Sequence, residues 1–139
     1  MYLLDTNVIS EFRKAESGRA DPHVATWAKN VLPASMFLSA ITMMELELGC
    51  LLMERRDEAQ GVLLRSWLED FVLPGFDGRI LIVDTPIARR SAALHLPNPC
   101  SYRDGLIAAT ALVHGMTVVT RNVAHFKPTG VAILNPWDA

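Results

Sequence analysis

Residues 2–10 read YLLDTNVIS, an apolar run that changes to polar residues at Asp5. The apolar residues 2–4 predict a short buried strand, and residues 7–14 predict a helix directly after it. A strand that passes straight into a helix is typical of an α/β fold, in which the helix packs back onto the sheet. We therefore expect Asp5 at the carboxyl end of the first strand.

The alternation of strand and helix continues to the end of the chain. Further strands are expected at 36–39, 80–83, 117–120 and 131–134, with helices at 23–32, 42–54, 57–73, 85–95 and 104–114. No hairpin turn joins adjacent strands, which predicts a mainly parallel five-stranded sheet with helices on both faces. We expect a three-layer α/β/α fold, and the length fits one domain spanning 1–139.

The composition argues against a disordered, secreted, membrane-spanning or zinc-binding protein. Half of the residues are hydrophobic and a fifth are charged, which argues against disorder. The N-terminus does not resemble a signal peptide, and no window reaches the roughly 18 uninterrupted apolar residues of a membrane span. Cys50 and Cys100 form neither a disulfide framework nor a paired zinc motif, and the four histidines lack zinc-ligand spacing. We expect a soluble, cytoplasmic protein.

Four polar residues fall where a parallel sheet collects its ligands. Asp5 follows the first strand, Glu45 lies near the start of the helix after the second strand, Asp104 begins an apolar helix, and Asn122 follows the fourth strand. The carboxyl ends of parallel strands share one edge of the sheet, so these residues are expected to meet there. Each also has a purely structural interpretation.

The structural interpretation of the three acidic residues is helix capping. Asp5 and Asp104 would cap their helices, and residues 42–45 (TMME) match a capping box, in which Glu45 reaches back to a backbone N–H. Against this, Glu45 shares a helix face with Ile41, Leu48 and Leu52, which predicts an inward-facing carboxylate. Clustered carboxylates repel one another, and a divalent cation is the usual relief. Oxygen ligands alone favour Mg²⁺ or Mn²⁺ over zinc.

These motifs resemble the PIN-domain proteins, and more closely the VapC-like ribonuclease toxins of bacterial toxin–antitoxin pairs, in the FitB-like branch. The matching segments keep the family's order and spacing over nearly the whole chain: 3–11 (LLDTNVISE), 38–46 (LSAITMMEL), 104–111 (DGLIAATA), 118–126 (VVTRNVAHF) and 133–137 (ILNPW).

The resemblance implies a specific site. Asp5, Glu45 and Asp104 would bind the metal, and Asn122 stands at a fourth catalytic position that is often Asp in the family. Supporting hydrogen bonds would come from Thr6, Asn7, Ser39 and Thr120. The resemblance also implies a homodimer or higher assembly, inhibited by an antitoxin whose basic side chain enters the acidic site. Operator DNA would be contacted only through the antitoxin.

The expected reaction is hydrolysis of an RNA phosphodiester by metal-activated water, which leaves a 5′-phosphate and a 3′-hydroxyl. Glu45 is a candidate for orienting that water or accepting its proton. The net charge of −2 does not indicate nucleic-acid binding by charge alone, but ten of the 13 basic residues are arginines. Arg103 and Arg121, next to proposed ligands, are candidate RNA-binding residues, and solvated helix faces are the alternative.

Two other function classes remain open. In a phosphotransfer enzyme Asp5 would be the nucleophile, but none of the three lysines, Lys14, Lys29 and Lys127, lies in a convincing phosphate-binding motif. In a non-catalytic module the acidic pocket would only capture a basic partner peptide, an alternative that Asn122 leaves open. A sequence-specific DNA-binding protein is disfavoured because no helix carries clustered base-reading residues.

Overall fold

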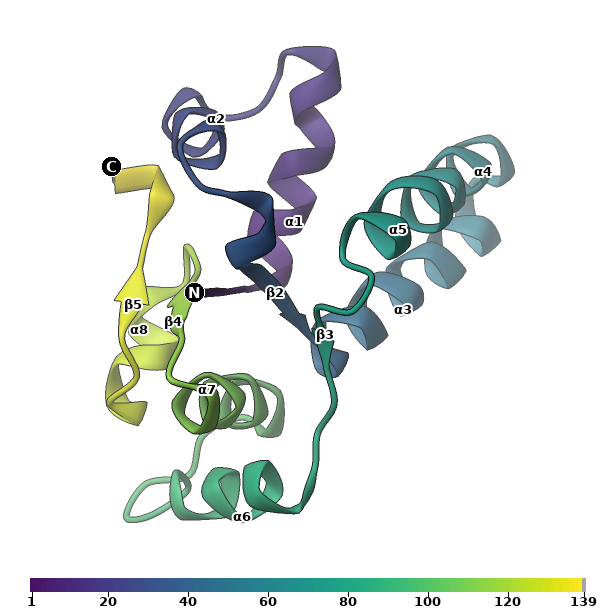
Figure 1. Cartoon of the computed structure of the whole chain (residues 1–139). Helices are drawn as coiled ribbons and strands as arrows, with labels where there is room; N and C mark the ends of the chain where they lie inside the picture. The colour runs from purple at the N-terminus through teal and green to yellow at the C-terminus, as the bar shows by residue number, and fades with distance from the viewer. Residues whose placement is uncertain (139) are drawn as a thin grey trace.

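The computed structural model describes residues 1–138, so the expected domain end at Ala139 lies outside the described residues. Five strands form one sheet in the order β3-β2-β1-β4-β5, and every neighbouring pair is parallel. The predicted parallel α/β sheet is confirmed (Figure 1). The strands are β1 (Tyr2–Leu4), β2 (Met36–Ser39), β3 (Ile80–Leu81), β4 (Thr117–Val119) and β5 (Ile133–Leu134).

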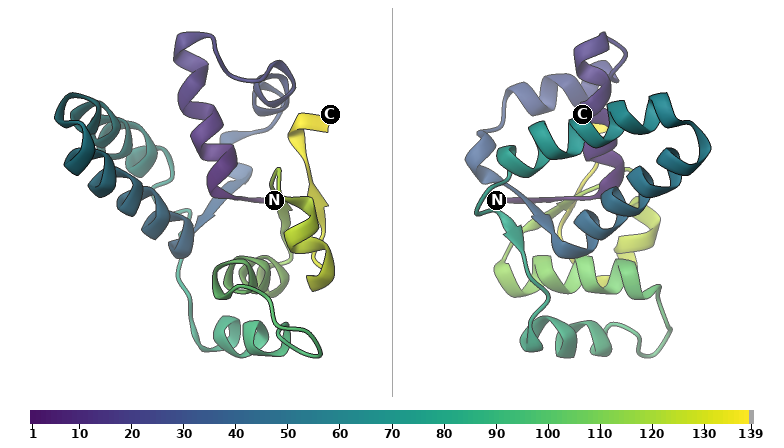
Figure 2. Two further views of the ribbon diagram at one scale, coloured as in Figure 1. Left: turned by 180° about the vertical axis from the view of Figure 1, so that it is seen from behind. Right: turned by 90° about the vertical axis from the view of Figure 1, so that its right-hand side faces the viewer.

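Helices connect the strands and cover both faces of the sheet (Figures 1 and 2). A π-helical segment, Leu68–Val72, continues α4 into α5. The helix α8 was not predicted, because four residues are too few to show a helical period. The helices are α1 (Thr6–Arg13), α2 (Pro22–Lys29), α3 (Ala40–Arg56), α4 (Glu58–Trp67), α5 (Leu73–Gly75), α6 (Thr85–Ala93), α7 (Tyr102–His114) and α8 (Val123–Phe126).

Side chains of the central strands alternate between two apolar layers. Leu4 and Val119 point into the layer formed with α1 and α3, whereas Leu3 and Val118 point into the layer formed with α7. This alternation follows from the period of two along a strand, and it anchors β1 and β4 on both faces. The ends of these two strands are therefore rigidly positioned.

The helices α3 and α4 form a hairpin that extends away from the sheet (Figures 1 and 2). The buried face of α3 is made by Thr42, Leu46 and Cys50, whereas Leu48 and Leu52 are more than half exposed. The expected inward face of Leu48 and Leu52 was therefore wrong. Hydrophobic spacing marks a helix face, but it does not show whether other elements of the same chain reach that face.

The start of α3 also differs from the expectation. The helix begins at Ala40, with Ser39 as its N-cap accepting a hydrogen bond from Ile41 N at 3.1 Å, so Glu45 lies in the second turn. Between Met1 and Asp138, no helix is both long and apolar enough to cross a membrane. Cys50 and Cys100 are free thiols.

Candidate metal centre

The site lies at the carboxyl ends of β1 and β4. The sheet order reverses between these strands, because the chain leaves β1 toward β2 and later returns to place β4 on the other side. Such a switch point leaves an opening at the sheet edge, where parallel α/β proteins bind ligands. The backbone N–H of Asp5 donates to Val119 O at 2.9 Å, which fixes Asp5 at this opening.

Asp5 is fully buried and accepts several hydrogen bonds. Thr6 N donates to Oδ1 at 2.8 Å, so Asp5 also acts as the N-cap of α1. On the other oxygen, Oδ2, the hydroxyl of Thr120 donates at 2.8 Å and Asn7 Nδ2 at 3.4 Å. The Asp5 carboxylate is thus held by the sequence-predicted residues Thr6 and Asn7 of α1 and by Thr120, directly after β4.

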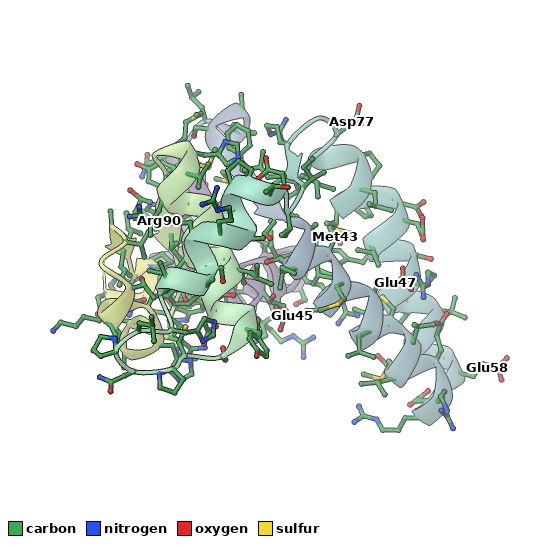
Figure 3. The ribbon with its side chains drawn as sticks, turned by 90° about the horizontal axis from the view of Figure 1, so that it is seen from below. Met43, Glu45, Glu47, Glu58, Asp77 and Arg90 are labelled. Atoms are coloured by element: carbon green, nitrogen blue, oxygen red, sulfur yellow. The ribbon has the colours of Figure 1, made fainter. Side chains whose placement is uncertain are left out.

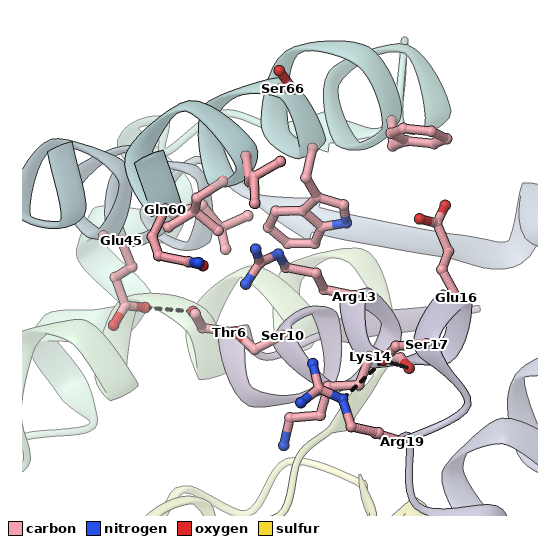
Figure 4. A pocket seen from close by; sticks show the side chains of 16 residues that line it. Thr6, Ser10, Arg13, Lys14, Glu16, Ser17, Arg19, Glu45, Gln60 and Ser66 are labelled. Carbon is pink, nitrogen blue, oxygen red and sulfur yellow. Dashed lines mark hydrogen bonds between the residues drawn. The ribbon is translucent and has the colours of Figure 1, made fainter. Parts of the chain in front are cut away.

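Glu45 approaches the same place from α3. Its Oε1 accepts a hydrogen bond from the Thr6 hydroxyl at 2.8 Å, drawn as a dashed line in Figure 4. Ser39 caps α3, so the capping-box interpretation of Glu45 is wrong. Figure 3 shows Glu45 where α3 leaves the body of the protein, whereas Glu47 and Glu58 lie farther out on the hairpin.

Asp104 is the third residue of α7. Ser101 caps this helix by accepting a hydrogen bond from Asp104 N at 3.0 Å, so Asp104 is not the cap and its carboxylate is available to the site. Its Oδ2 lies 3.6 Å from Nδ1 of His125, in α8. His125 was not predicted as a site residue, although it lies in the family-like segment 118–126 (VVTRNVAHF), three residues after Asn122.

A guanidinium group joins the three carboxylates. Arg103 donates hydrogen bonds from Nη2 to Asp5 and from Nη1 to Asp104, and its Nε forms an ion pair with Glu45 Oε2 at 2.6 Å. Burial lowers the pKa of Arg103, but the hydrogen bond to Glu45 and the charge of Asp5 outweigh burial and raise that pKa above its usual value. Arg103, a candidate RNA-binding residue from its sequence position, is therefore a permanent cation inside the acidic cluster.

The donor set fits a divalent cation in its chemistry. Carboxylate oxygens of Asp5, directly after β1, of Glu45 in α3 and of Asp104 in α7 converge on one positive group, and hard oxygen donors suit Mg²⁺ or Mn²⁺. Within residues 1–138, no three His, Cys, Asp or Glu side chains are arranged to share a metal ion as they stand. The carboxylates are organised instead around the larger guanidinium.

The remaining predicted residues lie around this cluster. Asn122 is exposed, and its backbone N donates to Thr120 Oγ1 at 3.0 Å, but its amide makes no hydrogen bond to the carboxylates among the described residues. Ser39 is buried and caps α3. The guanidinium of Arg121 lies over the ring of Trp137, 5.2 Å from its centroid, and its backbone N donates to Asn7 Oδ1 at 3.2 Å.

A cleft of about 740 Å³ leads away from Glu45 and Thr6, between α1 and the α3–α4 hairpin. In Figure 4, Glu45 and Thr6 lie at one end, Glu16 lies at the other, and Arg13 points from α1 into the space between them. The cleft combines basic side chains with aromatic ones, namely Arg13, Lys14, Arg19, Trp67 and Phe71.

The PIN domain family matches residues 2–129 of the chain. The chain belongs to the PIN-domain family. It is 39% identical to "VapC ribonuclease Y4jK" of Sinorhizobium fredii and 39% identical to "Toxin FitB" of Neisseria gonorrhoeae, in each case over 99% of both proteins. These relatives confirm the VapC and FitB resemblance inferred from the motifs.

The fold of this PIN domain agrees with that of a solved relative. The crystal structure of FitAcB from Neisseria gonorrhoeae superposes with a TM-score of 0.90 at 38% identity, covering all of both chains. The shared architecture places Asp5, Glu45 and Asp104 at the edge where the parallel sheet opens.

Proposed function

We propose that the protein is a Mg²⁺- or Mn²⁺-dependent endoribonuclease and the toxin of a type II toxin–antitoxin pair, acting in the cytoplasm as one domain over 1–139. The observation that carries this proposal is the convergence of Asp5, Glu45 and Asp104 on a single cationic position. The relatives named as a ribonuclease and a toxin support the choice of reaction.

In the proposed mechanism Asp5, Asp104 and Glu45 would hold the cation. The bound cation supplies charge neutralisation at the phosphate and an activated water. Glu45 is the most exposed of the three carboxylates, at 28% of its side chain, which suits it to orient that water and accept its proton. Thr6 orients Glu45 through the 2.8 Å hydrogen bond.

The cleft beside Glu45 supports RNA as the substrate. Its basic wall, which includes Arg13 and Lys14, offers cations for phosphates, and Trp67 offers an aromatic surface on which an unpaired base can stack. This arrangement suits a single strand better than a duplex, because bases must be unpaired to stack on protein rings. Arg121 is proposed as a further phosphate contact.

Assembly with an antitoxin is part of the same proposal, with operator DNA contacted only through the antitoxin. The acidic centre pairs with the guanidinium of Arg103, so an arginine of a partner peptide that displaced Arg103 would find the same charge and hydrogen-bond acceptors. A homodimer is supported by the exposed apolar side chains of the hairpin: Met44, Leu48, Leu51, Leu52, Val62 and Leu63.

The same guanidinium contact favours the second candidate, a non-catalytic module that only captures a basic peptide. Substitution of single carboxylates distinguishes the nuclease from the binding module, because only the nuclease needs them for RNA cleavage. We expect Asp5→Asn and Asp104→Asn to reduce cleavage of single-stranded RNA in Mn²⁺ by about a hundredfold or more. Asp77→Asn, on an exposed loop, is the matched control and should cleave like the parent.

RNA cleavage is measured with purified, antitoxin-free protein, and RNA ends are mapped for 5′-phosphates. If the parent cleaves no RNA in Mg²⁺ or Mn²⁺ but binds arginine-containing peptides, the binding module is the correct function. Equal cleavage by parent and Asp5→Asn protein would exclude the proposed mechanism.

A further inference from the structure

All three guanidinium nitrogens of Arg103 are paired with carboxylates of the acidic centre. Its three guanidinium nitrogens each contact a different carboxylate, on Asp5, Glu45 and Asp104, and Nη2 also lies 3.4 Å from the Thr6 hydroxyl. An arginine more commonly pairs two of its nitrogens with the two oxygens of a single carboxylate. The guanidinium therefore lies between the three carboxylates, not at one edge of the cluster.

The backbone holds Arg103 in this position. It is the second residue of α7, between the Ser101 cap and Asp104, so its Cα is fixed by the same helix that carries one of the carboxylates. The other two carboxylates are fixed by the start of α1, which Asp5 caps, and by α3, which carries Glu45. The guanidinium needs no partner chain to reach the cluster.

The positive charge of Arg103 reduces the repulsion among the three carboxylates. Three ionised carboxylates facing one another destabilise the folded chain, and one guanidinium offsets one of their three charges. A divalent cation offsets two charges and is small enough to bring the oxygens to 2.0–2.6 Å, roughly the distances typical of Mg²⁺ and Ca²⁺. Arg103 and such an ion therefore need the same space.

We propose that Arg103 is a resident counter-ion of the acidic centre, which a divalent cation must displace before the three carboxylates can close around it. This inference rests on the proposed metal-dependent function and adds a competitor from the chain itself. The side chain of Arg103 is 29% exposed, so a path to solvent is open to it without unfolding of α7. Metal affinity is then set by a competition within one molecule.

The competition predicts how substitutions change metal binding. Arg103→Gln removes the competing charge but keeps a polar helical residue, so Mn²⁺ should bind about tenfold tighter or more, because nearby charges interact strongly at a partly buried site. Arg103→Lys keeps the charge on one compact ammonium that cannot serve three carboxylates at once, and its affinity should lie between those of the parent and Arg103→Gln. Arg90→Gln, on the exposed side of α6, changes the net charge equally and should bind like the parent.

The test is calorimetric titration of Mn²⁺ into the chelator-treated full chain, repeated for the three variants. If parent and Arg103→Gln bind Mn²⁺ with equal affinity, Arg103 does not compete and the inference is overturned, although a metal-dependent nuclease stands. If neither binds Mn²⁺ and the parent cleaves no RNA, the proposed function fails as well. Should Arg103→Gln not fold, tighter binding by Arg103→Lys than by the parent still supports the displacement, and equal or weaker binding refutes it.

Discussion

The hydroxyl of Thr120 lies 2.8 Å from Oδ2 of Asp5, and neither residue is exposed to solvent. The two residues are 115 positions apart in the sequence. They follow β4 and β1, the strands that flank the switch point of the sheet. Because Asp5 is fully buried, this hydroxyl is one of the few donors that can stabilise its charge. The bond therefore links the stability of the fold to the geometry of the acidic centre.

Thr120→Val is expected to destabilise the protein by about 1–3 kcal/mol, because a buried charged acceptor loses a donor. RNA cleavage should fall as well, since Oδ2 of Asp5 loses its 2.8 Å hydrogen bond and keeps only the longer one from Asn7, at 3.4 Å. Urea unfolding in chelator measures the first effect, and initial rates in Mn²⁺ measure the second.

Thr42→Val is the matched control. Thr42 is also fully buried, but its hydroxyl has no hydrogen-bond partner among the described residues. Removing that hydroxyl should leave the free energy of unfolding unchanged or raise it by up to about 1 kcal/mol. If both variants lose the same stability, the Thr120–Asp5 hydrogen bond has no special role.

Glu45→Gln should reduce RNA cleavage by about a hundredfold or more while keeping the fold, because an amide cannot accept a proton from water. Glu47→Gln, on the same helix but paired with Arg65 at 2.7 Å on the hairpin, should cleave normally. Single-turnover rates with a short RNA report the difference. Full activity of Glu45→Gln would remove Glu45 from the proton-transfer role and leave it at most a ligand.

Much of the architecture is predictable from local sequence. The strands β1 and β2 are predicted to the residue, because each run of mainly apolar residues leads directly into a helix start. The strand β3 is shorter than expected, ending at Leu81, and the next residue, Ile82, is 71% exposed. Apolar character alone therefore overestimates strand length at the sheet edge.

The site was only partly predictable. Strand ends and motif order indicate that Asp5, Glu45 and Asp104 meet, because a parallel sheet gathers its carboxyl ends. The place of Arg103 does not follow from its sequence neighbours, since a residue beside a helix start can turn toward solvent or toward the cluster. Only the distance of three carboxylates from one guanidinium decides between these orientations.

Gly61 tests how the hairpin is packed. A Cβ at this position would lie 2.6 Å from the Cα of Glu54, a backbone atom that cannot move without shifting α3. Gly61→Ala should therefore destabilise the protein by about 1–3 kcal/mol. Gly49→Ala, where a Cβ meets nothing within 4 Å, should instead stabilise α3 by about 0.5–1 kcal/mol. Thermal unfolding of both variants measures the contrast, and equal melting temperatures would contradict the close contact.

Asn122→Asp should strengthen metal binding severalfold. Asn122 is exposed at the start of α8, and its backbone N is held by Thr120, which also binds Asp5. A carboxylate here adds a fourth negative charge beside the cluster, and oxygen anions attract Mn²⁺ more strongly than an amide does. Calorimetry should show tighter binding or a second Mn²⁺ per chain.

The matched control for that variant is Asn98→Asp, in an exposed loop, which changes the net charge by the same amount. Without metal, Asn122→Asp should lower the melting temperature, because the extra charge repels the existing carboxylates, whereas Asn98→Asp should not. An affinity shift shared by both variants would reflect net charge alone. A shift confined to Asn122→Asp would mean that this position faces the metal and that the native amide limits how strongly the centre holds it.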